Sequence, residues 1–281
     1  MKVLTELDKN PNLSIALGFF DGVHLGHQAV IKSAVNYAKQ NGTKSAVITF
    51  KDHPCCYLWN LKPKYILPQK IREKKIKELG IDYLYELDFE SISGLTAEDY
   101  IRDVLVKYFS PCAISTGWNH NFGYKKSGYE YFEIPPVRHS ELDSESNKNE
   151  IISSTAIRKY LQAGKIEKAN SMLGYKFFIS GEIVKGNQIG RTICFNTANI
   201  KYPEELIEIP FGAYSVDTNY GKGIANYGIR PTVNGSLPIL EVHILDFDRN
   251  IYGEKIQVEF IKMLRPERKF KSLEELKKQI E

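Results

Sequence analysis

Histidines and glycines are concentrated in one short segment, residues 18–27, which reads Gly-Phe-Phe-Asp-Gly-Val-His-Leu-Gly-His. Apolar residues precede it, and apolar residues recur at helical spacing after it until a glycine at position 42. A strand, a glycine turn and a helix N-terminus favour anion binding, because the first helical N–H groups are unpaired and glycine lets backbone approach closely. We therefore predict a phosphate site in this segment. Its residues are Gly18, Gly22, Gly26, His24 and His27.

The simplest alternative is an ordinary turn in which the two histidines only cap the helix that follows. A second apolar run, residues 45–50, comes after that helix and ends in Lys-Asp-His-Pro at 51–54. Strand, helix and strand form a β-α-β unit, whose ligands collect beyond the carboxyl ends of neighbouring strands. His53 is therefore expected near the same crevice as His24 and His27, which favours the phosphate site.

Hydroxyl side chains precede an arginine later in the chain, in Ser153-Ser154-Thr155 and Arg158. Hydroxyls at a helix start and a guanidinium one turn further suit the oxygens of a polyphosphate. The alternative is a simple helix cap, since serine and threonine favour that position in any case.

The elements that must position these residues change in kind near the middle of the chain. Up to about residue 115, short apolar runs alternate with helical segments, which predicts an α/β unit with a parallel sheet. Beyond about residue 174, alternation of apolar and polar residues between turns predicts an antiparallel sandwich or barrel. We place the domain boundary there, giving residues 1–173 and 174–281. The expected strands are residues 15–19, 46–50, 83–87, 113–115, 177–184, 212–218, 239–247 and 255–264, and the expected helices include residues 70–79, 97–108 and 166–173.

Composition restricts the class of protein. The chain has 281 residues, 42% of them hydrophobic, which suffices for two ordinary domains with buried cores. A net charge of +4, from 38 basic and 34 acidic residues, is too small to indicate nucleic-acid binding. The four cysteines have no C-x-x-C or metal-ligand spacing and are expected to be reduced thiols. Residues 1–9 are too charged for a signal peptide and no run can cross a bilayer, so we expect a cytoplasmic protein without a membrane partner.

Further motifs follow in a fixed order. They are Gly-Trp-Asn-His-Asn-Phe-Gly at 117–123, Ile-Ser-Ser-Thr-Ala-Ile-Arg at 152–158, Gly-Arg-Thr-Ile-Cys-Phe-Asn-Thr-Ala-Asn at 190–199, Ile-Arg-Pro-Thr at 229–232, Leu-Glu-Val-His at 240–243, Tyr-Gly at 252–253 and Leu-Arg at 264–265. Together with residues 18–27 and the Thr-Phe-x-x-His-Pro motif at 49–54, they extend over nearly the whole chain. In this respect the sequence resembles the bacterial bifunctional riboflavin kinase/FAD synthetase family.

For the N-terminal half, the resemblance implies a Rossmann-like nucleotidylyltransferase domain that transfers AMP from ATP to FMN, giving FAD and pyrophosphate. His24 and His27 are then expected to hydrogen-bond the triphosphate, whereas Asp21 is expected to shape the turn, because a carboxylate repels phosphate. Asn119 is expected to line the adenine or flavin side. The other residues expected to bind nucleotide or flavin are Gly18, Phe20, Gly22, Gly26, His53, Ser153, Ser154, Thr155 and Arg158.

For the C-terminal half, the resemblance implies a mainly antiparallel β-barrel with a C-terminal helix from Ser272, which phosphorylates riboflavin with ATP. Glu241 matches the catalytic base of the family, and Thr197 and Asn199 match the residues that hold Mg²⁺ and ATP. Leu240, Val242 and Ile244 are apolar, so Glu241 points away from their face of its strand, although an ordinary solvated glutamate does the same. Gly181, Gly186, Gly190 and Arg191 are expected to form a loop over the nucleotide, and Arg265 is expected among the binding residues.

The chain departs from the family pattern at four positions within these motifs. Phe19 replaces a small polar residue, His120 a phenylalanine, Cys194 a glycine and Asn196 a proline. The last two changes affect the nucleotide loop of the kinase half, and the helix from Ser272 stops early, so we expect a working but weakened kinase.

Two alternatives to the bifunctional enzyme stay open. One is an FAD synthetase with a weak or inactive kinase domain, and the other is a non-catalytic flavin-binding protein. Another nucleotidylyltransferase would account for the N-terminal half alone. The expected partners are the small molecules ATP, riboflavin and FMN, and the expected assembly is a monomer or weak homo-oligomer.

Overall fold

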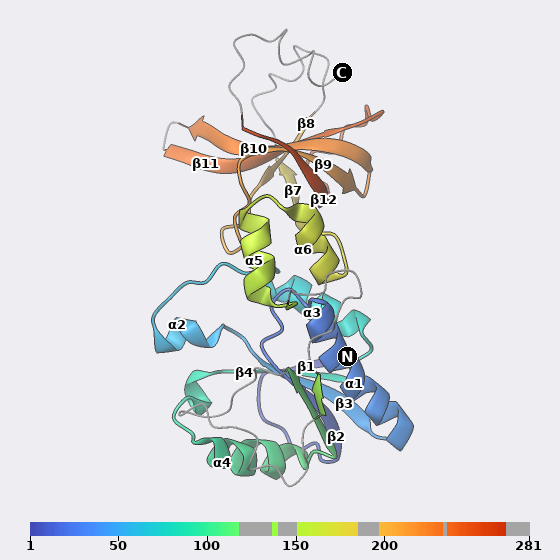
Figure 1. Ribbon diagram of the computed structural model, residues 1–281, viewed down its shortest axis with the longest axis vertical. Helices are drawn as coiled ribbons and strands as arrows, with labels where there is room; N and C mark the ends of the chain where they lie inside the picture. The colour runs from blue at the N-terminus through green and yellow to red at the C-terminus, as the bar shows by residue number, and fades with distance from the viewer. Residues whose placement is uncertain (118–136, 140–150, 185–196, 233–234, 268–281) are drawn as a thin grey trace. The chain divides into compact units, whose positions relative to one another are not determined.

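The computed structural model describes residues 1–117, 137–139, 151–184, 197–232 and 235–267. Contacts within the chain divide it into two compact units, Met1–Ser154 and Thr155–Glu281 (Figure 1), which are described separately below. The domain boundary near Gly174 stays a prediction. Several expected site residues lie outside the described ranges, namely Asn119, Gly186, Gly190, Arg191, Cys194 and Asn196, as does the helix expected from Ser272.

The first unit is built on a six-stranded sheet in the order β1-β4-β3-β2-β5-β6, in which every neighbouring pair is parallel. This confirms the expected α/β unit. The strands are β1 (Lys2–Leu4), β2 (Leu13–Leu17), β3 (Lys44–Phe50), β4 (Tyr83–Leu87), β5 (Ala113–Gly117) and β6 (Val137–His139).

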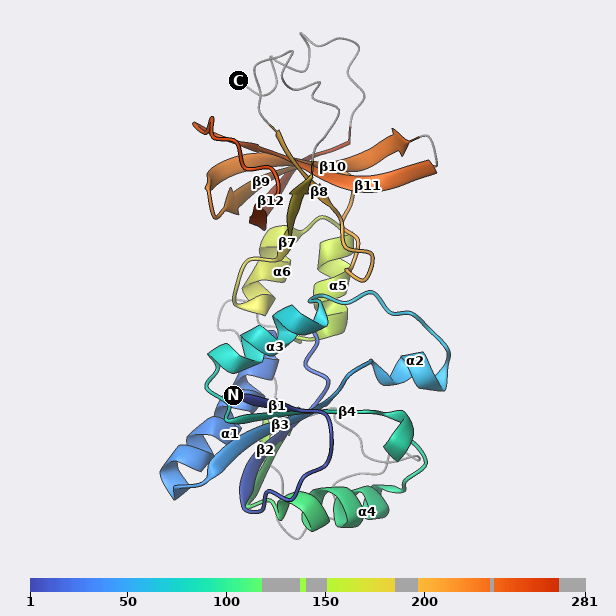
Figure 2. The same cartoon turned by 180° about the vertical axis from the view of Figure 1, so that it is seen from behind.

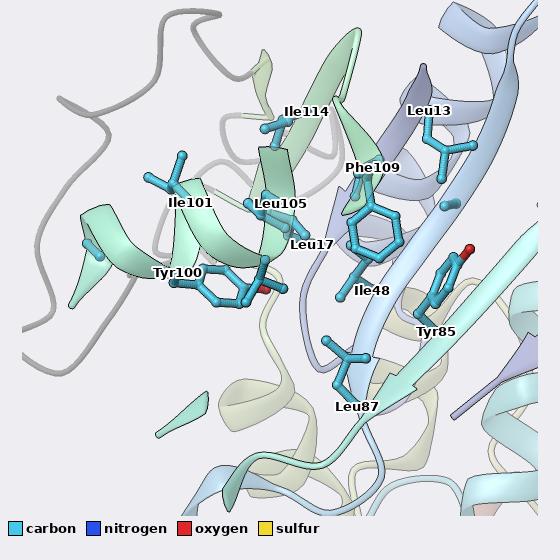
Figure 3. Close-up of a cluster of buried hydrophobic side chains, with 14 residues drawn as sticks. Leu13, Leu17, Ile48, Tyr85, Leu87, Tyr100, Ile101, Leu105, Phe109 and Ile114 are labelled. Carbon is cyan, nitrogen blue, oxygen red and sulfur yellow. The ribbon is translucent and has the colours of Figure 1, made fainter. Parts of the chain in front are cut away.

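Helices cover both faces of this sheet. Figures 1 and 2 show α1 (Leu25–Asn41) on one side and α4 (Ala97–Asp99), which continues into the π-helical segment η2 (Tyr100–Phe109), on the other. On the η2 side, alternate strand residues such as Leu17, Ile48 and Tyr85 pack against Leu105 and Phe109 (Figure 3). Because side chains on a strand alternate between the two faces of the sheet, the intervening strand residues face the side that carries α1.

The carboxyl ends of the two central strands of this sheet lie side by side. β2 and β3 pair in register, with Leu17 opposite Ile48, so the segments after both strands leave the sheet at the same edge. The first of these segments enters α1 at His24, and the second enters the short helix α2 (Pro54–Leu58) at His53. After α2 the chain forms α3 (Gln69–Glu78), and η1 (Glu90–Ile92) follows β4. The fold thus places the two histidine-bearing segments at one edge.

The second unit contains a closed barrel in the strand order β10-β11-β8-β7-β12-β9, and its strand pairs are antiparallel. This confirms the expected antiparallel barrel. Its strands are β7 (Phe178–Val184), β8 (Thr197–Lys201), β9 (Gly212–Thr218), β10 (Gly221–Thr232), β11 (Gly235–Ile244) and β12 (Lys255–Pro266), and they are preceded by α5 (Ser154–Gln162) and α6 (Ile166–Leu173).

One asparagine of helix α6 makes hydrogen bonds to the barrel strand β12 and to the segment before β7. The Asn170 side chain donates from Nδ2 to the carbonyl of Phe260 at 2.9 Å and accepts the Phe177 N–H at 2.8 Å. Inside the barrel, aromatic residues such as Tyr214, Tyr227 and Phe260 are fully buried. Because inward residues fill the barrel, the alternate residues of each strand must face outward.

Candidate functional site

The turn after β2 is sharp and is stabilised by a buried carboxylate. Phe20 and Val23 have positive φ angles of 59° and 36°, which side chains with a Cβ rarely adopt. Asp21 is 3% exposed, and its carboxylate accepts the backbone N–H groups of Ile66, at 3.0 Å and 3.3 Å, and of Leu67 at 3.4 Å. These bonds hold the turn, which agrees with the expectation that Asp21 shapes the segment rather than contacts phosphate.

The two histidines of this segment lie together at the start of α1. His24 is the N-cap, and its Nδ1 accepts the backbone N–H of His27 at 3.3 Å. The two imidazole rings stack with centroids 3.5 Å apart at 20°, and Phe20 packs edge-on against His27. The capping alternative is therefore true of His24, yet capping also brings both rings to the helix N-terminus, where an anion binds.

The protonation of His24 follows from its surroundings. Its side chain is buried, and this burial lowers its pKa from 6.5 to about 4. The ring is therefore neutral near pH 7. Because Nδ1 accepts a hydrogen bond, the single ring proton is assigned to Nε2, which can donate to a phosphate oxygen.

Glycines in this segment make room for its own side chains. A Cβ at Gly26 would lie 3.2 Å from Cε1 and Nδ1 of His24, and one at Gly18 would lie 2.9 Å from Cζ of Phe20. Gly22 combines a φ of 80° with a Cβ position 3.0 Å from Cδ1 of Ile66. At each of the three glycines a Cβ would crowd a specific neighbouring side chain.

His53 contacts Phe19, which belongs to the segment 18–27 that carries His24 and His27. Its Nδ1 accepts the backbone N–H of Cys55 and caps α2, and its ring lies edge-on to Phe19 with centroids 4.8 Å apart. Tyr65 packs on the same phenylalanine, and its hydroxyl accepts the backbone N–H of His53 at 3.4 Å. A cavity of about 260 Å³ borders His53, lined by Lys51, Asp52, His53, Cys56, Tyr57, Asp88, Phe89 and Glu90.

The serine-threonine motif is divided between the two units. Ser154 donates from Oγ to the carbonyl of Asp21 at 2.9 Å and so ties its segment to the histidine turn, while Ser153 is half-buried. Thr155 is exposed and Arg158 half-buried, and both belong to the second unit. The structure thus joins Ser154 of this motif to the first site.

A second group of polar residues lies on the outer face of the barrel, where Asn199 is 4% exposed and Thr197 and Glu241 are half-buried. Glu241 of β11 is paired with Asn199 of β8, and His243 is paired with Thr197. Leu240 and Val242 are fully buried, whereas Glu241 is half-buried, so the alternation expected from the sequence is confirmed. The structure therefore brings Glu241 and Asn199 together, with Thr197 two residues away on the same face.

The oxygen donors on this face fit a magnesium ion. The Thr197 hydroxyl and the Asn199 side-chain carbonyl are hard oxygen ligands, which Mg²⁺ prefers alongside water and phosphate. Two residues apart on one strand, they face the same side. Thr197 also lines a small cavity of about 100 Å³, together with Ile183, Ala198, Ile244, Phe247, Asp248, Arg249, Asn250, Ile251 and Tyr252.

Gly181 and Arg265 both lie on barrel strands, and the binding role expected of Arg265 stays a prediction. Gly181 belongs to strand β7 and not to a loop, so that expectation was wrong, and a Cβ there would lie 2.5 Å from Cγ2 of Ile200. Arg265 lies on β12, which is separated from β8 by β7. Strand pairing therefore does not place Arg265 beside Glu241.

Sequence reasoning missed Arg72 and Tyr65, which contact the first site, and Asn226 of β10, which is paired with Glu241. For Asn226, alternation along a recognised strand would have been a signal. The helices in the described ranges include none that is long and apolar enough to span a bilayer.

Comparisons with known proteins identify a family for each half of the chain. Residues 6–156 match the family model described as FAD synthetase, and residues 173–281 match the one described as riboflavin kinase. A bifunctional riboflavin kinase/FMN adenylyltransferase of Listeria monocytogenes is 37% identical, covering 96% of this chain and 90% of that protein. Proteins of the same name from Bacillus subtilis and Escherichia coli K12 are 35% and 34% identical, each covering 95% of this chain and 89% and 88% of the relative.

A solved structure has the same fold throughout. The crystal structure of a protein from Streptococcus pneumoniae, named there as a macrolide-efflux protein, matches with a TM-score of 0.89 at 30% identity. The match covers 99% of this chain and 96% of that one. With both catalytic domains matched and relatives similar over nearly their full length, the chain belongs to the bifunctional riboflavin kinase/FMN adenylyltransferase family.

Proposed function

We propose that this protein phosphorylates riboflavin with ATP to give FMN, and then transfers AMP from a second ATP to FMN to give FAD and pyrophosphate. The observation that carries this proposal is the presence of two separate sites of different chemistry. One has stacked histidines at a helix N-terminus, and the other pairs a glutamate with an asparagine on a barrel.

The adenylyl transfer would take place at the first site. An oxygen of the FMN phosphate attacks the α-phosphorus of ATP, and pyrophosphate leaves without a covalent enzyme intermediate. Such a reaction needs alignment and stabilisation of charge on the leaving group. The Nε2–H of neutral His24 donates to a triphosphate oxygen, and His27 is stacked where its ring can act on the same anion.

The cavity beside His53 is the proposed position of the flavin ring. Tyr57 and Phe89 supply aromatic walls. Three carboxylates, those of Asp52, Asp88 and Glu90, outnumber the single ammonium of Lys51, so the lining disfavours a phosphate. The ring end of FMN therefore fits this cavity better than its phosphate end. The phosphate end would lie towards His24 and His27. A Tyr57→Ala variant should raise KM for FMN more than KM for ATP, and the reverse result would assign the cavity to adenine.

The kinase reaction would take place on the outer face of the barrel. A neutral ribityl hydroxyl is a poor nucleophile, and the Glu241 carboxylate is the proposed base that accepts its proton. Thr197 and Asn199 would hold Mg²⁺, which when bound neutralises negative charge on the ATP phosphates. The adjoining cavity offers the Arg249 guanidinium and the Tyr252 ring for other parts of the nucleotide.

The decisive experiment incubates the purified protein with Mg-ATP and either riboflavin or FMN and separates the flavins by chromatography. FAD from both substrates supports the two-step enzyme. FAD from FMN alone would favour the alternative in which the kinase is weak or inactive. No product from either substrate, together with tight flavin binding, would instead favour a flavin-binding protein.

A further inference from the structure

One buried arginine contacts the ends of three neighbouring strands in the first unit. Arg72 of α3 is 2% exposed. Its Nη1 donates to the carbonyl of Phe19 at 3.4 Å, and its Nη2 donates to the carbonyl of Phe50 at 3.0 Å. Nη2 also lies 3.5 Å from the carbonyl of Lys51 and 3.5 Å from the carboxylate of Glu86. One guanidinium therefore joins the end of β3, the segment after β2 and strand β4.

The surroundings of Arg72 fix the orientation of this guanidinium. Its centre lies 4.3 Å from the centroid of the Phe19 ring, in a cation–π contact. Glu86 is 3% exposed, and its second carboxylate oxygen accepts a hydrogen bond from Gln69 at 2.9 Å. The buried ion pair is thus contacted on both sides, by the Phe19 ring at the guanidinium and by Gln69 at the carboxylate.

These contacts lie just before both histidine-bearing segments. Phe19 comes five residues before His24 in the turn that leads to the stacked rings, and Lys51 comes two residues before His53. We infer that Arg72 is a positioning residue of the adenylyltransferase site, which fixes the distance between the His24–His27 segment and the His53 segment. This inference rests on the proposed adenylyl transfer.

Arginine suits this role in a way that lysine does not. Its planar guanidinium presents N–H groups in a rigid fork, so one side chain can bond several carbonyls at fixed angles. A lysine keeps the charge beside Glu86 but presents a single ammonium on a flexible stem. A shift of about 1 Å in catalytic groups can lower a rate by about 100-fold. Replacing the fork should therefore impair adenylyl transfer even where the unit stays folded.

The test compares Arg72→Lys with the wild-type protein, using FMN and Mg-ATP as substrates. We expect kcat for adenylyl transfer to fall at least about 10-fold and KM for ATP to rise, because the His24–His27 segment shifts relative to the His53 segment. The rise in KM is the informative result. A smaller folded fraction lowers kcat only, since KM is a property of the molecules that remain folded.

Controls come from the chain itself. Arg102→Lys makes the same change at an exposed arginine that is paired with Asp99 and Asp103, and it should leave both reactions unchanged. Phosphorylation of riboflavin by the Arg72 variant should stay within about twofold of the wild-type rate, because that site lies in the other unit. Amide hydrogen exchange of peptides from residues 1–117, measured by mass spectrometry, reports whether the first unit is folded.

The outcomes separate this inference from the proposed function. If the wild-type protein makes no FAD from FMN, the proposed function fails. If it does, and folded Arg72→Lys has the wild-type kcat and KM for ATP, Arg72 is merely structural and the inference is overturned. Should Arg72→Lys not fold, Glu86→Gln decides. This substitution removes the ion pair with Arg72 and keeps a side-chain oxygen that can accept the hydrogen bond from Gln69. A raised KM for ATP supports the inference, and an unchanged KM refutes it.

Discussion

Glu241 of β11 lies directly opposite Asn199 of β8 on the outer face of the barrel. Residues opposed in this way have Cβ atoms roughly 5 Å apart, so a carboxylate and an amide can act on one bound molecule. Asn226 of β10 is paired with Glu241 from the other side. Three strands thus contribute one row of polar side chains with the proposed base in the middle.

Replacing Glu241 by glutamine should strongly slow phosphorylation of riboflavin without affecting adenylyl transfer. Glutamine keeps the size and the hydrogen-bonding capacity but cannot accept the proton of the ribityl hydroxyl. General bases contribute roughly 10²- to 10⁴-fold, and a loss of that size is expected in FMN formation from riboflavin. Chromatography of the flavins measures both reactions. Glu259→Gln, on another strand of the barrel, is the matched control, and an active Glu241→Gln would show that Glu241 is not the base.

Replacing Asn199 by aspartate should change the magnesium dependence of the kinase reaction. Two carboxylates opposite each other repel unless a cation lies between them. FMN formation from riboflavin should therefore fall in the variant at limiting magnesium, and saturating magnesium should restore most of it. Asn199→Asp activity that matches the wild type at both magnesium concentrations would separate Asn199 from Glu241 functionally.

Elements with strong local periodicity were predictable from the sequence. The alternation of apolar and polar residues around Glu241 correctly predicts that its side chain faces away from the buried Leu240 and Val242, because successive side chains on a strand face opposite sides. Strand β10 was not predicted, since Gly221, Gly223 and Gly228 make it resemble a loop. Pairing with β9 and β11 makes it a strand. Glycine suits position 223 because a Cβ there would lie 2.5 Å from the carbonyl oxygen of His243 on β11. Pairing with neighbours outweighs local propensity there.

The first site was predictable only in part. The histidine turn, its glycines and the strand before His53 form a continuous local pattern, and the structure brings His24 and His27 together as expected. Arg72 has no such signal. It lies in a helix with Lys70, Lys74, Lys75 and Lys77, and nothing in the local sequence separates it from those surface charges. Only the parallel pairing of β2 and β3 brings the carbonyls of Phe19 and Phe50 to one guanidinium.

Replacing Gly26 by alanine should impair adenylyl transfer while leaving the kinase reaction intact. The new Cβ would lie 3.2 Å from Cε1 and Nδ1 of His24, so the imidazole has to move from its stacked position. We expect a loss of roughly 10- to 100-fold in the rate of FAD formation from FMN, because the donor is misplaced. Gly94→Ala is the matched control, since nothing lies within 4 Å of its Cβ position. A fully active Gly26→Ala would mean that the position of His24 is not critical.

Replacing His24 by asparagine should flatten the dependence of the first unit's stability on pH. Asparagine can still cap α1, but it does not titrate. The folded pKa of His24 is about 4 and the unfolded value is 6.5, so the unfolded chain binds the extra proton between these values. The stabilisation is therefore complete above pH 6.5 and is lost as pH falls towards 4.

The expected difference can be measured by urea unfolding followed through amide hydrogen exchange of peptides from residues 1–117, which reports on the first unit. Between pH 7.5 and pH 5, the wild-type unit should lose about 2 kcal/mol more stability than the His24→Asn unit. The comparison cancels other titrating groups, since both proteins contain them. Parallel stability curves for the two proteins would show that folded His24 takes up a proton as readily as the unfolded chain. His24 would then be charged near pH 5 and would contact phosphate as a cation, whereas a measured difference supports a neutral Nε2–H donor.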